Sequence, residues 1–273
     1  MSTSIFSLTG SHYIVTGSSG LLGQQHCLSI AEAGGTPIMI DLDIEQSSNL
    51  ANSIHHQFNL TPLVFKADIS REDELQVLLS SIIDLNVAGL INNASRNPTV
   101  SSSGVLFSNR IEDFSIDEWN RDLSVGLTGS FLCTKTFSPL IYNSSKSGSI
   151  VNISSDLGLI APNQSLYSDI PPTRPDSTVK PVTYSVIKSA LIGLTRYTAT
   201  YYAHVGLRCN CLCPGGVQHQ QSSDFLNRIN NLIPMARMAS VDEYRGAIIF
   251  LLSSASSYMT GSVLSIDGGR TCW

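Results

Sequence analysis

Short apolar runs alternate with segments of helical periodicity along the whole chain. Strands are expected at residues 13–15, 37–40, 63–65, 87–91, 149–153, 207–213 and 262–266. Helices are expected at residues 21–33, 45–57, 72–83, 116–142, 183–203 and 241–253. The strand runs rarely alternate apolar with polar residues, which is typical of a parallel sheet buried on both faces. The sequence therefore predicts one α/β domain over residues 1–273, with a doubly wound parallel sheet of the Rossmann type.

The composition narrows the possible partners. Hydrophobic residues make up 42% of the chain, charged residues 14%, and the formal net charge is −5. A disordered chain would show the opposite balance, and binding to nucleic acid or an anionic membrane needs a basic surface. The first ten residues are polar, and no run of 18 apolar residues occurs. We therefore expect a cytoplasmic protein that binds neither nucleic acid nor membrane.

Three of the six cysteines, Cys209, Cys211 and Cys213, alternate along one expected strand. Alternate side chains on a strand share a face but lie roughly 6.5–7 Å apart, whereas zinc ligands converge on one ion. We expect these cysteines to be small buried residues, with neither a disulfide framework nor a metal site.

A glycine-rich turn joins the first expected strand to the first expected helix. It reads Thr16-Gly17-Ser18-Ser19-Gly20-Leu21-Leu22-Gly23. Gly17 permits a tight turn, Gly20 lets the backbone approach a pyrophosphate, and Gly23 allows close packing of helix on strand. The amino end of the helix then faces the phosphates with its positive dipole. This context predicts a dinucleotide site.

Asp41 ends the second expected strand, 18 residues after Gly23. A carboxylate at this place accepts hydrogen bonds from both adenosine ribose hydroxyls and repels a 2′-phosphate. No Lys or Arg occurs in the glycine turn or directly after Asp41. The expected cofactor is therefore NAD; the alternative is that Asp41 is an ordinary solvated residue.

Tyr184 and Lys188 are four residues apart on an expected helix and share a face. A neighbouring ammonium stabilises a phenolate and lowers the pKa of the phenol, so the pair can exchange a proton with an alcohol or carbonyl. The pattern is common on amphipathic helices and gains meaning only in combination with other motifs.

That combination is present. The glycine turn, Asn92-Asn93-Ala94, Ser154-Ser155, Tyr184-x-x-x-Lys188, Pro214-Gly215 and Asp267-Gly268-Gly269 occur in this order over nearly the whole chain. In this the sequence resembles the short-chain dehydrogenase/reductase superfamily, in its branch of about 250 residues. The resemblance implies an NAD-dependent oxidoreductase that transfers a hydride between nicotinamide and a hydroxyl or carbonyl carbon.

The resemblance also implies a role for individual residues. Tyr184 would be the general acid/base, Ser155 would hold the substrate oxygen, and Lys188 would bind the nicotinamide ribose and tune Tyr184. Asn92 and Asn93 would brace the central strands near the cofactor. The remaining cofactor-binding residues would be Gly17, Ser19, Gly20, Leu22, Gly23, Asp41, Asp68, Ile69, Asn93, Ala94, Pro214, Gly215 and Val217.

Two positions depart from the family pattern. Gly126 stands where a Val-Asn-Leu-x-Gly run would place an Asn that supports a proton relay, and His219 replaces a usual threonine. A glycine inside the helix predicts local distortion and a close approach, with room for a bulky substrate or a relay water beside Lys188. A cofactor-binding regulatory or scaffold protein with impaired turnover is one alternative, and an epimerase with tightly held NAD is another.

Two segments, 95–115 and 157–182, are too long for ordinary connections. We expect 157–182 to be a substrate lid: it carries Arg174 and Lys180, which can hold a carboxylate or phosphate. This favours a polar small-molecule substrate such as a sugar or nucleotide-activated sugar. The alternative is that the residues of this segment belong to a solvated surface loop or a subunit contact. Runs near Tyr184 and Asp267 also resemble bacterial flagellin-modification and surface-sugar oxidoreductases. The family resemblance further implies a homo-oligomer, a tetramer or dimer.

Overall fold

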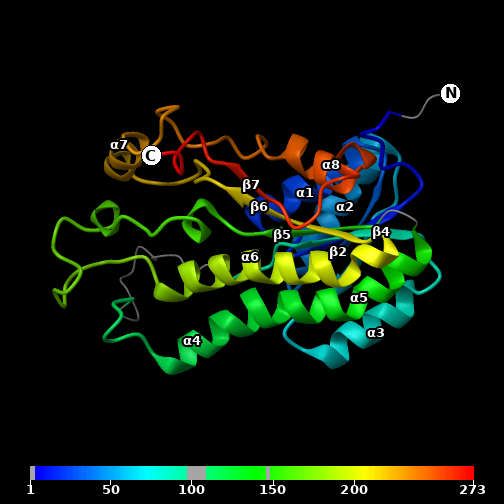
Figure 1. The fold of residues 1–273 in the computed structure, drawn as a ribbon, viewed down its shortest axis with the longest axis horizontal. Coiled ribbons are helices and arrows are strands. Elements are labelled where there is room, and N and C mark those ends of the chain that lie inside the picture. The colour runs from blue at the N-terminus through cyan, green and yellow to red at the C-terminus, as the bar shows by residue number, and fades with distance from the viewer. Residues whose placement is uncertain (1–3, 97–108, 146–147) are drawn as a thin grey trace.

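Seven parallel strands form a single sheet in the computed structural model, which describes residues 4–96, 109–145 and 148–273. The order across the sheet is β3-β2-β1-β4-β5-β6-β7, so the chain winds outward from β1 in one direction and then from β4 in the other (Figure 1). The strands are β1 (His12–Thr16), β2 (Thr36–Asp41), β3 (Leu63–Lys66), β4 (Val87–Asn92), β5 (Ser149–Ile153), β6 (Arg208–Pro214) and β7 (Val263–Ile266).

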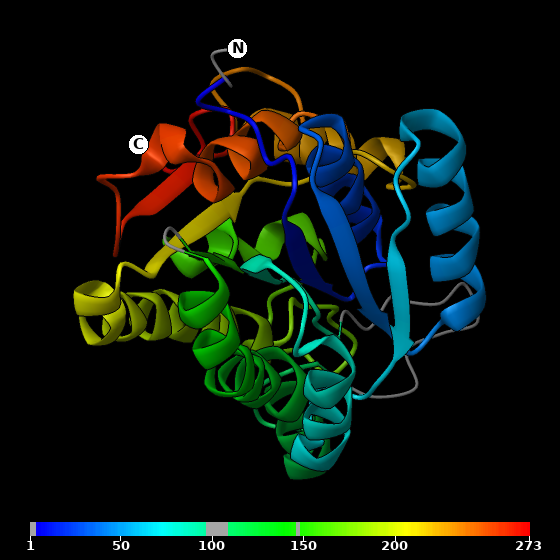
Figure 2. The ribbon, with the colours of Figure 1, turned by 90° about the vertical axis from the view of Figure 1, so that its right-hand side faces the viewer.

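Helices cover both faces of this sheet (Figures 1 and 2). Helices α1, α2 and α8 lie on one face, and α3, α5 and α6 lie on the other. The α-helices are α1 (Leu21–Glu32), α2 (Ile44–Phe58), α3 (Glu72–Ile82), α4 (Ile116–Leu123), α5 (Ser130–Ser144), α6 (Val182–Tyr202), α7 (Ser223–Asn230) and α8 (Arg245–Leu252). A π-helical segment, η1 (Ser124–Gly129), joins α4 to α5, and short 3-10 turns are η2 (Asp156–Gly158), η3 (Gln164–Leu166), η4 (Ala203–Val205) and η5 (Ser254–Ser256).

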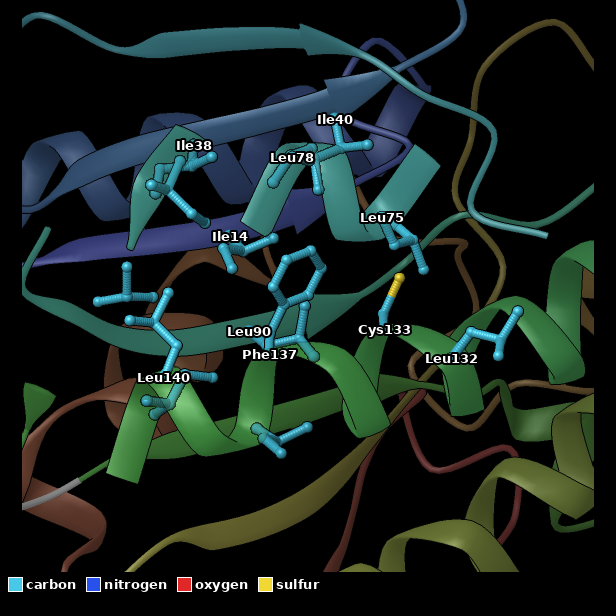
Figure 3. Close-up of a cluster of buried hydrophobic side chains, with 14 of the residues drawn as sticks. Ile14, Ile38, Ile40, Leu75, Leu78, Leu90, Leu132, Cys133, Phe137 and Leu140 are labelled. Carbon is cyan, nitrogen blue, oxygen red and sulfur yellow. The ribbon is translucent and has the colours of Figure 1, made fainter. Parts of the chain in front are cut away.

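Successive residues of β1 point to opposite faces, and both faces are apolar. Ile14 lies in one core with Leu78 of α3 and Phe137 of α5 (Figure 3). Val15 lies in a second core with residues of α1 and α8. Burying a large apolar side chain contributes about 1.5–3 kcal/mol, so each face of the sheet stabilises its own layer of helices. This double coverage explains why the strand sequences are continuously apolar.

The expected strands and the expected α/β architecture are confirmed. The expected helix 116–142 is one helical rod whose middle is η1, so the distortion predicted around Gly126 is present. The helix α7 was not expected, because its eight residues lie in a polar stretch after β6. Of the long segment 95–115, residues 97–108 lie outside the described part. None of the described helices is both long and apolar enough to cross a membrane.

Candidate active site

The glycine turn after β1 is folded as its spacing predicts. Gly17 has a φ of +65°, a conformation that favours glycine. A Cβ on Gly23 would lie 2.0 Å from the carbonyl oxygen of Gly17, so α1 packs against the turn at a distance that excludes any side chain there. The turn therefore brings the amino end of α1 against the carboxyl end of β1.

The amino end of α1 has backbone N–H groups to offer a ligand. Gly20 is the N-cap residue and supplies no side-chain cap, and the first turn of α1 carries no acidic residue. Beside it, Asp41 Oδ2 accepts a hydrogen bond from Ser19 N at 2.8 Å, and Oδ1 accepts one from Asp43 N at 3.0 Å. A carboxylate has about four acceptor positions, so Asp41 keeps acceptor capacity for ribose hydroxyls.

Two asparagines at the end of β4 hold the neighbouring strands. Asn92 Nδ2 donates to Asn152 Oδ1 on β5 at 2.8 Å. Asn93 Nδ2 donates to the carbonyl oxygens of Thr16 and Gly17, each at 3.0 Å. A Cβ on Gly17 would lie 2.8 Å from Ala94 Cα, so this segment also packs directly on the glycine turn.

A cavity of about 550 Å³ lies at this carboxyl edge of the sheet. Its lining has the parts that a dinucleotide site needs: a glycine turn with a helix amino end, and acidic side chains at the ends of the adjacent strands. Nine of the predicted cofactor residues line this cavity: Gly17, Ser19, Gly20, Leu22, Asp41, Asp68, Ile69, Asn93 and Ala94.

The segment after β6, which the sequence also assigned to the cofactor site, does not line this cavity. Gly215 lines a separate cavity of about 120 Å³ with residues of the β7 end, and Tyr244 Oη donates to the Gly215 carbonyl at 2.9 Å. Pro214 is buried, and Val217 forms an isolated bridge with Ala239. His219, the departure from the family pattern, is exposed.

The three predicted catalytic residues lie together. Ser155 follows β5, Tyr184 and Lys188 come from one face of α6, and the Ser155 hydroxyl lies near enough to the Tyr184 phenol to lower its pKa. Lys188 is buried; its Nζ donates to the carbonyl oxygen of Ile153 at 2.9 Å and lies 5.7 Å from the centre of the Tyr184 ring. Ser154 instead donates its hydroxyl to the Lys188 carbonyl at 2.6 Å, which fixes β5 against α6.

Burial governs the titration of this group. It lowers the pKa of Lys188 to about 8 and raises the pKa of Tyr184 above its ordinary value. The groups that lower the pKa of Tyr184 are Ser155, through its hydrogen bond, and Arg270, through its charge. The sequence instead predicted that Lys188 would lower the pKa of Tyr184, and Lys188 is not among these groups.

Two charged residues that the sequence did not single out stand next to Ser155. Arg270 Nη1 forms a buried ion pair with Asp156 Oδ2 at 2.7 Å, and Asp156 Oδ1 accepts the Ser155 hydroxyl at 2.7 Å. These residues are 114 positions apart, so no local pattern could have paired them. A second buried carboxylate, Asp122, accepts from Thr183 Oγ1 at 2.6 Å and from Arg96 Nη1 at 3.1 Å.

The space at Gly126 is filled. A Cβ there would lie 2.8 Å from Cγ2 and 3.1 Å from Cδ1 of Ile187, which comes from α6. The close approach that the sequence predicted is present, because Ile187 occupies the space that a side chain at position 126 would need. The room predicted for a substrate or a relay water beside Lys188 stays a prediction.

Two family models match the chain. The model described as short chain dehydrogenase matches residues 11–168, and the model described as enoyl-(acyl carrier protein) reductase matches residues 176–271. Galactitol 2-dehydrogenase of Rhizobium johnstonii is 29% identical over 98% of this chain and 98% of its own length. Trans-4-hydroxycyclohexanecarboxylate dehydrogenase of Sinomonas cyclohexanicum is 29% identical over 94% of this chain and 92% of its own length.

A solved structure shares the whole fold. The short chain dehydrogenase of Leptospira borgpetersenii, solved with bound NAD+, superposes with a TM-score of 0.81, covers 99% of this chain and 96% of its own, and is 28% identical. The first family model alone spans more than half of the 273 residues, and its matched region contains the glycine turn and Ser155. The chain therefore belongs to the short-chain dehydrogenase/reductase family and is an oxidoreductase.

Proposed function

We propose that this protein uses NAD to interconvert a hydroxyl and a carbonyl group on a polar, sugar-like substrate. The observation that supports this best is the contact of Ser155 with Tyr184, one helical turn from Lys188, at the same sheet edge as the 550 Å³ cavity. Ser95 and Arg96 line both this cavity and a small one, of about 20 Å³, around Tyr184 and Lys188, so the two cavities adjoin.

The roles follow from the positions. The Ser155 hydroxyl holds the substrate oxygen, and the Tyr184 phenol takes or returns the proton on that oxygen. The buried ammonium of Lys188, fixed by the Ile153 carbonyl, binds the nicotinamide ribose and supplies positive charge beneath Tyr184. Bound NAD supplies the hydride acceptor. The proposed cofactor contacts are the nine residues of the cavity lining, together with Gly23, Pro214, Gly215 and Val217.

Asp41 is the basis for proposing NAD. Its carboxylate is fixed at the end of β2 by the backbone N–H of Ser19, inside the cavity lining. A 2′-phosphate at this place would meet a negative charge, whereas a 2′-hydroxyl can donate to it.

The polar substrate is proposed from the segment 157–182, which we propose is a lid. Lys180 Nζ lies 3.9 Å from the centre of the Tyr184 ring, and within the described residues it forms no ion pair with a carboxylate. A cation free to bind an anion or a polyol beside the proposed proton donor favours a hydroxylated or acidic substrate over an acyl chain. One relative is named for a polyol and the other for a hydroxy acid, which supports the same proposal.

The sequence resemblance extends the proposal to a cytoplasmic homo-oligomer with a place in surface-glycan biosynthesis. The oligomer would use the outer faces of α4, α5 and α6, which carry exposed apolar side chains.

The test is hydride transfer to NAD over a panel of polyols, aldonic acids and fatty alcohols, with wild type and Tyr184→Phe. Wild type is expected to turn over members of the first two groups. Tyr184→Phe keeps the ring and loses only the proton donor, so kcat should fall about 10²–10⁴-fold with NADH binding nearly unchanged.

Tyr197→Phe is the matched control, because Tyr197 is an exposed tyrosine of the same helix. Near-normal activity of Tyr184→Phe would remove Tyr184 from the mechanism. Tight NADH binding with no turnover on any substrate would favour a second function, a cofactor-binding protein with impaired turnover. The filled space at Gly126 also favours this second function.

A further inference from the structure

A buried ion pair connects the last turn of the chain to the proposed catalytic serine. The side chains of Arg270 and Asp156 are 7% and 3% exposed, and the two are bonded at 2.7 Å. Asp156 directly follows Ser155, and Arg270 lies four residues after β7. Removing two charges from water costs free energy that their attraction does not always recover, so a buried ion pair need not stabilise the fold. The contacts that the ion pair makes with Ser155 explain its presence better than fold stability does.

The two oxygens of the Asp156 carboxylate have different partners. Oδ2 accepts from Arg270, whereas Oδ1 accepts from the Ser155 hydroxyl at 2.7 Å and from Leu157 N at 2.8 Å. A serine hydroxyl has one proton to donate, and a carboxylate can only accept. Ser155 Oγ also accepts from Leu157 N at 3.1 Å, and its contact with the Tyr184 phenol lowers the pKa of Tyr184, as donation of its one proton to the phenolate would. The contacts thus connect Tyr184 through Ser155 to Asp156 and Arg270.

We infer that Asp156 and Arg270 form a positioning pair, in which the carboxylate fixes the Ser155 side chain beside Tyr184 and the guanidinium neutralises the carboxylate. This inference rests on the proposed function. Neither residue touches the reacting atoms, and each acts through Ser155 or through its charge. A merely structural pair would tie the carboxyl-terminal turn to η2 without any effect on Tyr184.

The charges around Tyr184 show why both members are needed. Asp156 raises the pKa of Tyr184, and Arg270 lowers it. Among the described residues, two lysines also face the ring: Lys180 Nζ lies 3.9 Å from its centre and Lys188 Nζ lies 5.7 Å from it. The intact pair leaves little net charge, whereas loss of either member leaves one uncompensated charge beside the phenol.

The experiment compares Arg270→Met, Asp156→Asn and the double variant by the pH profile of kcat in the direction of alcohol oxidation. Arg270→Met leaves the carboxylate uncompensated and should move the rising limb, which follows deprotonation of Tyr184, to higher pH. Asp156→Asn leaves the guanidinium and should move that limb to lower pH, with a raised KM because Ser155 is held less well. The double variant should return the limb toward wild type. A shift of one pH unit changes kcat about tenfold on that limb.

Arg245→Met is the matched control, since Arg245 forms an ion pair with Glu32 on the opposite side of the sheet, between α8 and α1. Its pH profile should equal that of wild type. Where a charge-removing variant does not fold, Asp156→Glu carries the test. It keeps the charge but displaces the carboxylate, so kcat should fall at least tenfold with NADH affinity unchanged.

Variants that lower the Tm but leave kcat, KM and the pH profile at wild-type values would overturn the inference and leave a structural pair. An unchanged kcat in Asp156→Glu would also overturn it. Failure of the proposed function is distinguishable, because it would show as full activity in Tyr184→Phe, whereas failure of this inference leaves an enzyme that still depends on Tyr184.

Discussion

Asp41 supports the fold and, in the proposed function, also sets the choice of cofactor. Its carboxylate ends β2, accepts the backbone N–H of Ser19 in the glycine turn, and accepts that of Asp43 on its own loop. These two bonds fix its position without saturating it, since a carboxylate can accept about four. The same negative charge therefore supports the turn and faces the place where a ribose would bind.

We predict that wild type binds NADH more tightly than NADPH and that Asp41→Ala erodes this preference. A hydrogen bond to a charged group contributes about 1.5–3 kcal/mol, so the affinity for NADH should fall about 10–100-fold. The affinity for NADPH should rise or stay constant, because the repulsion of its phosphate is relieved. Fluorescence titration with both cofactors gives the two dissociation constants.

Asp43→Ala is the matched control, because Asp43 is a carboxylate two residues away that caps α2 through Gln46 N. It should lower stability slightly without altering the ratio of the two affinities. A wild-type protein that binds NADPH more tightly than NADH would contradict the role given to Asp41.

Residues that belong to a local pattern were the ones that sequence could find. The glycine turn, Asn93 and Tyr184 stand at fixed offsets from a strand end or on one helix face, so their contacts follow from the backbone they sit on. Asp156 and Arg270 have no such signal, because their meeting depends on how the carboxyl-terminal turn folds back over β5. Long-range ion pairs of this kind need the tertiary structure.

At the scale of elements, the long helix beside the site is interrupted where the sequence departs from its family. The π-helical segment η1 contains Gly126, and the missing side chain lets Ile187 of α6 approach the backbone closely. The sequence predicted both the distortion and the close approach. It could not predict which atoms fill the space, because that depends on the rotamer of a residue on another helix.

We predict that Gly126→Asn lowers the free energy of unfolding and does not raise kcat. The new side chain must displace Ile187, and overpacking of a core costs about 1–3 kcal/mol. Ile187→Ala removes the obstructing carbons, so the double variant should be more stable than the sum of the two single effects, with a coupling of about 0.5–3 kcal/mol. Denaturant unfolding of the four proteins measures this coupling.

Gly246→Asn serves as the control, because a Cβ on this glycine of α8 meets nothing within 4 Å. It should have little effect on packing. A tenfold or larger rise of kcat in Gly126→Asn, about 1.4 kcal/mol of barrier, would instead mean that the native proton relay is impaired.

The element that sequence missed, α7, has a physical explanation. Its eight residues bury Ile229, and Phe225 packs on Tyr167 with ring centres 5.9 Å apart. A helix this short has little intrinsic stability and forms because a tertiary partner covers its apolar side. That partner lies in the segment 157–182, so α7 could not be expected before the path of that segment was known.

At the scale of the whole molecule, one side of the sheet carries helices whose outer faces remain apolar. Phe131 on α5 is 50% exposed and Tyr197 on α6 is 67% exposed. Ile116 on α4, Val186 on α6 and Tyr201 on α6 are also exposed. In Figure 1, α4 and α5 follow one another end to end and run alongside α6. Several large apolar side chains on adjacent helices are typical of a surface that another protein chain covers.

We predict that these faces pair with a second copy of the chain, which gives a dimer or tetramer in solution. Light scattering at micromolar concentration should then give a multiple of the 29.4 kDa chain mass. Phe131→Asp and Tyr197→Asp should each shift the mass toward the monomer, because a charge buried in the interface would lack a partner. Tyr258→Asp is the control, since Tyr258 is fully exposed beyond α8. The Tyr258→Asp variant should have the same mass as wild type. A monomeric wild-type protein would contradict the prediction. Equal masses for all variants would mean that the interface lies elsewhere.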